Sequence, residues 1–178
     1  MLYSSYNYQE MNPQANLPAG HLRALRKILS MLKDQPVEWV LTGSTGMALH
    51  GMPLPVHDID LQTGREGAYA IQQRLAEYIV TPVRWVESEL IRSHLGLFQI
   101  DGVPVELMGA LQKCLADGTW EEPVRVALHR QWLEFDGLPL PVLSLEYEYI
   151  AYLKLARLDK AAQIRDWLHP VGASPAAN

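Results

Sequence analysis

The chain has 178 residues, of which 48% are hydrophobic and 20% charged, with a formal net charge of -5. This composition predicts a globular domain with a sizeable core, and no apolar run approaches the roughly 20 residues that a membrane span needs. A single cysteine, Cys114, excludes an internal disulfide, and the six scattered histidines offer no zinc-binding spacing. The negative charge disfavours long nucleic acid as a partner, because such a partner selects a basic face.

The two ends of the chain have the polar, proline-containing composition of loosely ordered segments, at residues 1–20 and 170–178. The first of these shows neither the basic start nor the apolar stretch of a signal peptide, so we expect a cytoplasmic location. Between them we expect an α/β domain over residues 21–143 and a helical segment over residues 144–169.

The first half of the domain reads as a helix, a strand, a short helix and a second strand. In chain order, these elements are predicted at "HLRALRKILSMLKD" (21–34), "VEWVLT" (37–42), "TGMALHG" (45–51) and "HDIDLQT" (57–63). Pro53 and Pro55 forbid helix and force an extended approach to the second strand. Asp58 and Asp60 therefore lie on a strand.

The second half alternates further strands with helices. The predicted elements are a helix at 66–79, a strand at 81–87, hairpins at 95–109 and 131–144 that turn at Asp101-Gly102 and Asp136-Gly137, and one or two helices over 144–168. The stretch "ALQKCLADG" (110–118) reads as helical, with Cys114 as a structural thiol. The expected fold class is α+β, with a small mixed β-sheet flanked by helices and a C-terminal helical segment.

Two acids on one strand indicate a cation. Residues two apart share a strand face, so Asp58 and Asp60 point the same way while Ile59 and Leu61 enter the core. Parallel carboxylates repel each other unless solvent or a cation intervenes, and hard divalent cations favour such oxygen ligands. The alternative is an ordinary solvated strand face.

Two further features extend this pattern. Gly43 and Ser44 follow a buried strand directly, where small residues let backbone amides approach an anion such as phosphate, although no Walker loop is present. Glu106 is an isolated acid in the apolar strand "GVPVELMG" and is the preferred third carboxylate. Asp101 is the competing choice, but hairpin chemistry alone explains an Asp before Gly102.

Three segments together resemble the signature of the nucleotidyltransferase superfamily: "WVLTGS", "HDIDL" and "VELMG". This superfamily includes DNA polymerase beta, antibiotic-modifying nucleotidyltransferases and abortive-infection toxin enzymes. The resemblance covers residues 37 to 108 and implies transfer of a nucleoside monophosphate from an NTP to a hydroxyl acceptor. It implies that Gly43 and Ser44 hold the triphosphate and that Asp58, Asp60 and Glu106 surround Mg²⁺ or Mn²⁺, with Glu106 either a metal ligand or the base.

The same resemblance extends weakly to the last helices, where toxin-like members place a Lys and an Arg on nucleotide phosphates. Lys154 and Arg157 match that pair, although an ion-paired, solvated helix face explains them equally well. His50 and Arg65 flank the predicted site and are weaker candidates for nucleotide contacts.

Two other functions stay open from sequence. A non-catalytic nucleotide-binding or toxin–antitoxin module with the same fold would serve a protein partner instead of turning over NTP. A metal-dependent phosphohydrolase would use His57-Asp58 as its metal-binding pair, which requires a helix and further histidine ligands.

Overall fold

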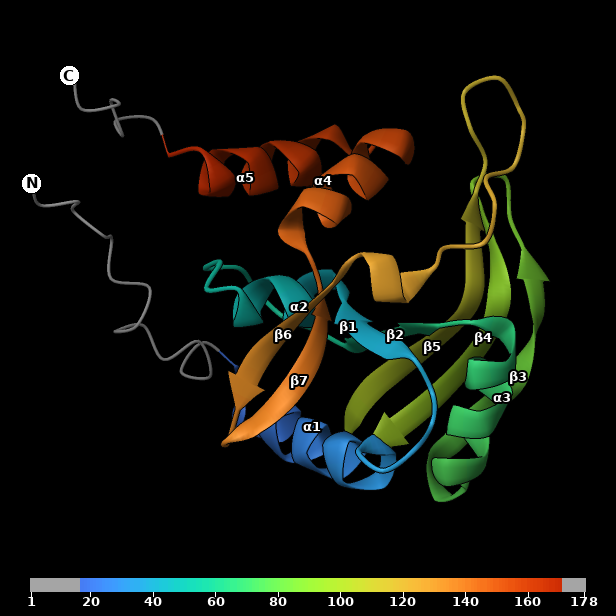
Figure 1. Cartoon of the computed structure of the whole chain (residues 1–178), viewed down its shortest axis with the longest axis vertical. Coiled ribbons are helices and arrows are strands. Elements are labelled where there is room, and N and C mark those ends of the chain that lie inside the picture. Colours follow the sequence, from blue (N-terminus) through green and yellow to red (C-terminus); the bar gives the residue numbers. More distant parts are fainter. Residues whose placement is uncertain (1–16, 171–178) are drawn as a thin grey trace, which may run out of the picture.

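The computed structural model describes residues 17–170, which form one mixed sheet with helices on both sides (Figure 1). The strand order is β3-β4-β5-β2-β1-β7-β6, with parallel pairing of β1 with β7 and of β2 with β5. The strands are β1 (Trp39–Thr42), β2 (Ile59–Thr63), β3 (Ile79–Glu87), β4 (Ile91–Ile100), β5 (Val103–Lys113), β6 (Arg130–Phe135) and β7 (Leu138–Leu143). The helices are α1 (Ala19–Leu32), α2 (Gly43–Leu49), α3 (Arg65–Arg74), α4 (Leu145–Lys154) and α5 (Leu158–Leu168), with 3-10 turns η2 (Ala76–Tyr78) and η3 (Val126–Leu128). The expected α+β class with a mixed sheet is confirmed.

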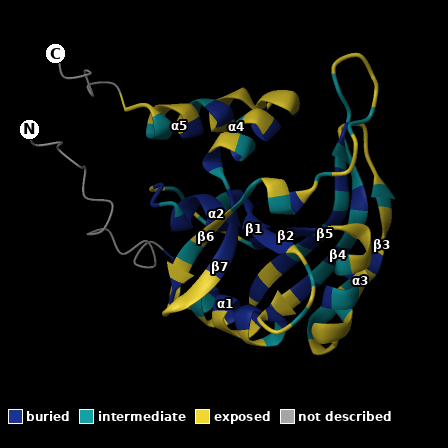
Figure 2. Cartoon of the chain, in the orientation of Figure 1, coloured by how far each residue is buried: buried dark blue, intermediate teal, exposed yellow. Residues whose placement is uncertain are grey.

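The main core lies between the sheet and the helices α1 and α3. Helix α1 contributes a stripe at helical spacing that includes Leu25, Ile28 and Leu32, and all four residues of β1 are buried. Figure 2 shows β1 and β2 as the most buried strands, at the centre of the sheet. A central position explains why both strands are buried, including their polar residues Thr42, Gln62 and Thr63.

A second core joins the C-terminal helices to α2. Met47 of α2 and Met52 pack with Leu145 and Tyr152 of α4 and with Ile164 of α5. Helices α4 and α5 therefore lie over α2, on the side of the molecule away from α1 (Figure 1). The segment predicted to be helical over residues 144–169 folds as these two helices and closes one side of the sheet near the predicted acids.

Both predicted hairpin turns are present. Asp101 and Gly102 have φ angles of 52° and 79°, and Asp136 and Gly137 have φ angles of 52° and 75°. Two consecutive residues with positive φ make the tight turn that suits the twist of paired strands, and Asp tolerates this region better than most residues. Among residues 17–170, no helix has the length and apolar character that crossing a membrane would require.

The predicted helix over residues 110–118 is wrong, because β5 continues to Lys113. Ala110 has a φ of 51°, and the pairing with β4 shifts register between Arg92 and His94. This bulge interrupts the strand's alternation, so the apolar residues fall at spacings of three and four that imitate a helix. Cys114 follows the strand, half-buried, in a single bridge with Trp120.

Candidate active site

Two of the three predicted acids face each other on neighbouring strands. Asp60 of β2 is in direct parallel register with Glu106 of β5, while their chain neighbours Ile59 and Leu107 are fully buried on the opposite face. Asp58 lies just before β2, in the segment without helix or strand after α2, so of the two acids predicted to share a strand only Asp60 lies on it. That segment lacks the helix that the phosphohydrolase alternative requires.

The acids Asp60 and Glu106 line a cavity of about 210 Å³ between the sheet and α4. Its other polar lining residues are Thr42, Gln62, Lys113, Tyr147, Glu148, Tyr152 and Arg157. The Nε2 atom of Gln62 is buried without a hydrogen-bond partner, and so is the Oγ atom of Ser44 beside the cavity's Gly43. Buried polar atoms without partners are uncommon in native structures, so these two groups are candidates for a ligand contact.

The acids raise each other's affinity for protons. Burial raises the pKa of Asp60 to about 8, and the charges of Asp58 and Glu106 add to this effect. Burial, and then the charge of Asp58, also raises the pKa of Glu106. A bound cation would relieve the repulsion within this carboxylate cluster.

An all-oxygen donor set of this charge fits Mg²⁺ or Mn²⁺. Asp58 and Asp60 would hold the ion, and Glu106 stands opposite Asp60. Within residues 17–170, no group of three or more His, Cys, Asp or Glu side chains is placed to hold a metal ion.

The turn at Gly43 is built around Asp60. Gly43 has a φ of +68°, and a Cβ atom added there would lie 2.0 Å from Oδ2 of Asp60. Only glycine fits a position that combines this conformation with such a close approach. Next along the chain, the Thr45 hydroxyl donates to the backbone carbonyl of Asp58 at 2.5 Å, which ties the start of α2 to the predicted metal ligand.

Glu148 of α4 is a site residue that sequence reasoning missed. Its Oε1 atom accepts a hydrogen bond from the Gly43 amide at 2.9 Å and another from the Thr42 hydroxyl. Burial raises the pKa of Glu148, and the two hydrogen bonds oppose that effect. The available signal was the position of this acid on the buried stripe of α4, between Leu145 and Tyr152.

Lys113 was missed because the bulge at Ala110 hid the end of β5. Its side chain is only 2% exposed, and its Nζ lies 3.4 Å from Oε2 of Glu121 and 3.3 Å from the Tyr147 hydroxyl. Burial lowers its pKa, against the attraction of Glu121. The bulge thus directs the side chain of Lys113 towards the cavity that Asp60 and Glu106 line.

The structure separates Lys154 from Arg157. Lys154 is exposed, forms an ion pair with Glu121 and is not among the residues that line the cavity. Arg157 lines the cavity, from the junction of α4 and α5. The weaker candidate His50 binds the backbone carbonyl of Leu143 through Nε2, at 2.9 Å.

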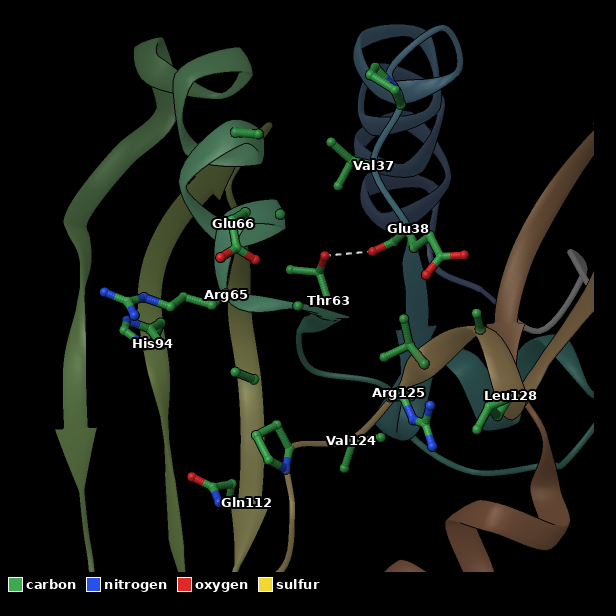
Figure 3. A pocket seen from close by; sticks show the side chains of 18 of the residues that line it. Val37, Glu38, Thr63, Arg65, Glu66, His94, Gln112, Val124, Arg125 and Leu128 are labelled. Atoms are coloured by element: carbon green, nitrogen blue, oxygen red, sulfur yellow. Dashed lines mark hydrogen bonds between the residues drawn. The ribbon is translucent and has the colours of Figure 1, made fainter.

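A second pocket of about 830 Å³ lies at the other end of β2, and Arg65 lines this pocket, not the acidic cavity. Figure 3 shows Arg65 and Glu66 on one side of it and Arg125 and Leu128 on the other. At its edge the Thr63 hydroxyl donates to the backbone carbonyl of Glu38 at 2.5 Å. The structure therefore keeps Arg65 away from the acids.

Acids on adjacent strands beside a glycine turn are the arrangement that the resemblance to the nucleotidyltransferase superfamily implies, and comparison with known proteins agrees. The model of the aminoglycoside-2''-adenylyltransferase family matches residues 24–166. The chain therefore belongs to this family, and the predicted superfamily is confirmed.

Solved structures show the same fold. TM1012 of Thermotoga maritima, whose own assignment as a nucleotidyltransferase is provisional, is 51% identical, with a TM-score of 0.74 over 83% of this chain and 92% of that one. The lincosamide antibiotic adenylyltransferase LnuA, with lincomycin bound, is 13% identical, with a TM-score of 0.54 over 80% of this chain and 94% of that one. ANT(2'')-Ia in complex with adenylyl-2''-tobramycin is 14% identical, with a TM-score of 0.51 over 83% and 89%. At these low identities the last two support the fold alone. No match was found among proteins of curated function.

Proposed function

We propose that the protein transfers the adenylyl group of ATP to a hydroxyl of a small molecule, with a divalent cation held by Asp58 and Asp60. The observation that carries this proposal is the direct opposition of Asp60 and Glu106 in the cavity that also contains Gly43. Family membership supports the nucleotide donor, and the unpartnered hydroxyl of Ser44 supports a phosphate contact beside the acids.

The reaction requires a nucleophile, an electrophile and a leaving group in line. The acceptor oxygen forms a bond to the α-phosphorus, the bond from that phosphorus to the bridging oxygen breaks, and pyrophosphate leaves. A bound divalent cation supplies neutralisation of the charge that develops on the attacking and leaving oxygens. Positioning and electrostatics then provide most of the rate gain.

Glu106 has two roles that fit its place. As a ligand it would complete the oxygen set with Asp60, which lies opposite it on β2. As a base it would take the proton of the acceptor hydroxyl, a role suited to a carboxylate whose pKa is raised by burial.

The solved relatives provide the first acceptors to test. ANT(2'')-Ia was solved with an adenylylated tobramycin and LnuA with lincomycin. We therefore include hydroxylated antibiotics of the aminoglycoside and lincosamide classes as the first acceptors to test. A protein acceptor and a tRNA end complete the panel.

The test incubates pure protein with radiolabelled ATP, Mg²⁺ and each acceptor, and measures pyrophosphate release together with a product heavier by one AMP. The other three NTPs test the choice of nucleotide. Pyrophosphate and an adenylylated product support the proposal. NTP binding without turnover would support a non-catalytic module, and phosphate release without an acceptor would support a hydrolase.

A further inference from the structure

We infer that Glu148 is a positioning residue, which holds the turn at Thr42 and Gly43 in the shape that the nucleotide site requires. This inference rests on the proposed function, because it assigns a role within the same site. Glu148 belongs to α4 and is separated from Gly43 by 105 residues. The C-terminal helices would then hold the Thr42–Gly43 turn in shape as well as cover it.

The contact is specific to one carboxylate oxygen. Oε1 of Glu148 accepts from both the Gly43 amide and the Thr42 hydroxyl. The side chain is 5% exposed and lines the cavity with Asp60. No ion pair among residues 17–170 includes Glu148. The carboxylate therefore accepts hydrogen bonds directly from two neutral donors. Removing the acceptor would leave two buried donors unsatisfied, which is costly.

The turn transmits this contact to the acids. Gly43 lies so close to Asp60 that even a Cβ atom would collide with Oδ2. A shift of the Gly43 backbone therefore changes the space available to the Asp60 carboxylate. Because catalysis depends on geometry to within a fraction of an ångström, a small shift of this turn is expected to change the rate strongly.

An alternative role can be separated by experiment. The carboxylate also stands where an anion could approach the Gly43 amide, so it could compete with a phosphate instead of supporting its site. Glutamine keeps an oxygen acceptor at the same position and removes the charge. If Glu148 positions the turn, Glu148→Gln retains the kcat that Glu148→Ala loses. If Glu148 instead competes with phosphate, both variants bind NTP more tightly than wild type.

The experiment compares wild type, Glu148→Gln, Glu148→Ala and the control Glu146→Gln, which alters an exposed acid on the same helix. We expect Glu148→Ala to lower kcat at least tenfold and Glu148→Gln to restore it to within about threefold, with Glu146→Gln unchanged. Each variant is assayed well below its unfolding midpoint, because a purely structural role would lower that midpoint and leave kcat of the folded protein intact. Wild-type kcat in folded Glu148→Ala, or equal loss in Glu148→Gln, would overturn the inference.

A second measurement does not depend on turnover. Hydrogen exchange of the Gly43 amide, followed by NMR, should be at least tenfold faster in Glu148→Ala than in wild type and Glu148→Gln. Equal exchange in all three would also overturn the inference. If the wild type turns over no nucleotide with any acceptor, the proposed function fails, while the exchange result still decides whether Glu148 holds the turn. If Glu148→Ala does not fold, Thr42→Val, which removes one of the two donors, should show a smaller loss of kcat in the same direction.

Discussion

Asp60 and Glu106 lie directly opposite each other on the parallel strands β2 and β5. Both carboxyl groups face a cavity, both have raised pKa values because of burial, and the charge of Asp58 raises each further. Such an arrangement destabilises the folded protein until a proton or a cation neutralises it. The acids that the proposed chemistry requires therefore lower the stability of the folded protein when neither a proton nor a cation neutralises them.

Asp60→Asn should stabilise the protein in the absence of metal, in a pH-dependent way. An unfolded Asp loses its proton near pH 4, about its ordinary pKa, whereas folded Asp60 keeps the proton up to a pKa of about 8. The stability contributed by this proton is therefore fully present below about pH 4 and is lost as the pH rises towards about 8. We expect a higher unfolding midpoint for Asp60→Asn than for wild type at pH 9 and no difference between them near pH 4.

Thermal unfolding at both pH values, in a chelator, measures this difference, and exposed Asp34→Asn is the control. Mg²⁺ should raise the midpoint of wild type and not that of Asp60→Asn.

Nucleotidyl transfer should be abolished by Asp58→Asn and by Asp60→Asn, since each removes a proposed ligand. Full turnover in both variants would contradict the site.

Glu106→Gln should lower turnover strongly, whereas Asp101→Asn should change it little. Asp101 lies in the hairpin turn and is ion-paired with Lys27 at 2.5 Å, so its role is explained without the site. Asn also tolerates the turn conformation, and losing a surface ion pair costs at most about 1 kcal/mol.

Steady-state kinetics and calorimetric titration with a non-hydrolysable NTP distinguish the roles of Glu106. Loss of kcat with unchanged affinity indicates the base, and loss of both indicates a ligand. An inactive Asp101→Asn beside an active Glu106→Gln would mean that the third acid is misassigned.

Gly43→Val should lose Mg²⁺-NTP binding, and Gly43→Ala should lose most of it. The φ of +68° disfavours any side chain, and the Cβ atom would lie 2.0 Å from Oδ2 of Asp60. Titration by calorimetry measures the affinity, and Gly102→Ala is a matched control, because Gly102 also has a positive φ but open space around its Cβ position. Equal NTP affinity in wild type and Gly43→Val would place the nucleotide elsewhere.

Ser44→Ala should weaken NTP binding without destabilising the fold. Its Oγ atom is buried and has no partner in the protein, so the folded state loses no hydrogen bond when the hydroxyl is removed. A lost hydrogen bond to a charged phosphate is worth about 1.5–3 kcal/mol, or roughly 10- to 150-fold in affinity. A reduced unfolding midpoint with unchanged affinity would show that Ser44 is structural.

Arg157→Gln should reduce NTP affinity more than Lys154→Gln does. Arg157 lines the cavity, whereas Lys154 is exposed and bound to Glu121. The sequence does not distinguish these two residues, because spacing on a helix does not show which residue its end directs into a cavity. Calorimetric titration with a non-hydrolysable NTP compares the two variants. A greater loss of NTP affinity in Lys154→Gln would contradict this assignment.

The sequence by itself determined the order of most elements and the identity of the acid-bearing strands. Alternation in "HDIDL" and "VPVELM" determines which side chains share a face, because strand geometry has a period of two. Asp-Gly pairs located both hairpin turns for an equally local reason, their tolerance of positive φ. These features depend on neighbours in the chain, and a sequence contains those neighbours.

Tertiary structure decided which distant residues complete the site. The parallel pairing of β2 with β5 brings Asp60 opposite Glu106, and the packing of α4 brings Glu148 onto Gly43 across 105 residues. The bulge at Ala110 directs Lys113 towards the cavity. The same bulge gives the end of β5 a residue spacing that resembles a helix. Strand partners, bulges and helix docking are fixed by contacts between segments far apart in the chain, so no local pattern of residues could specify them.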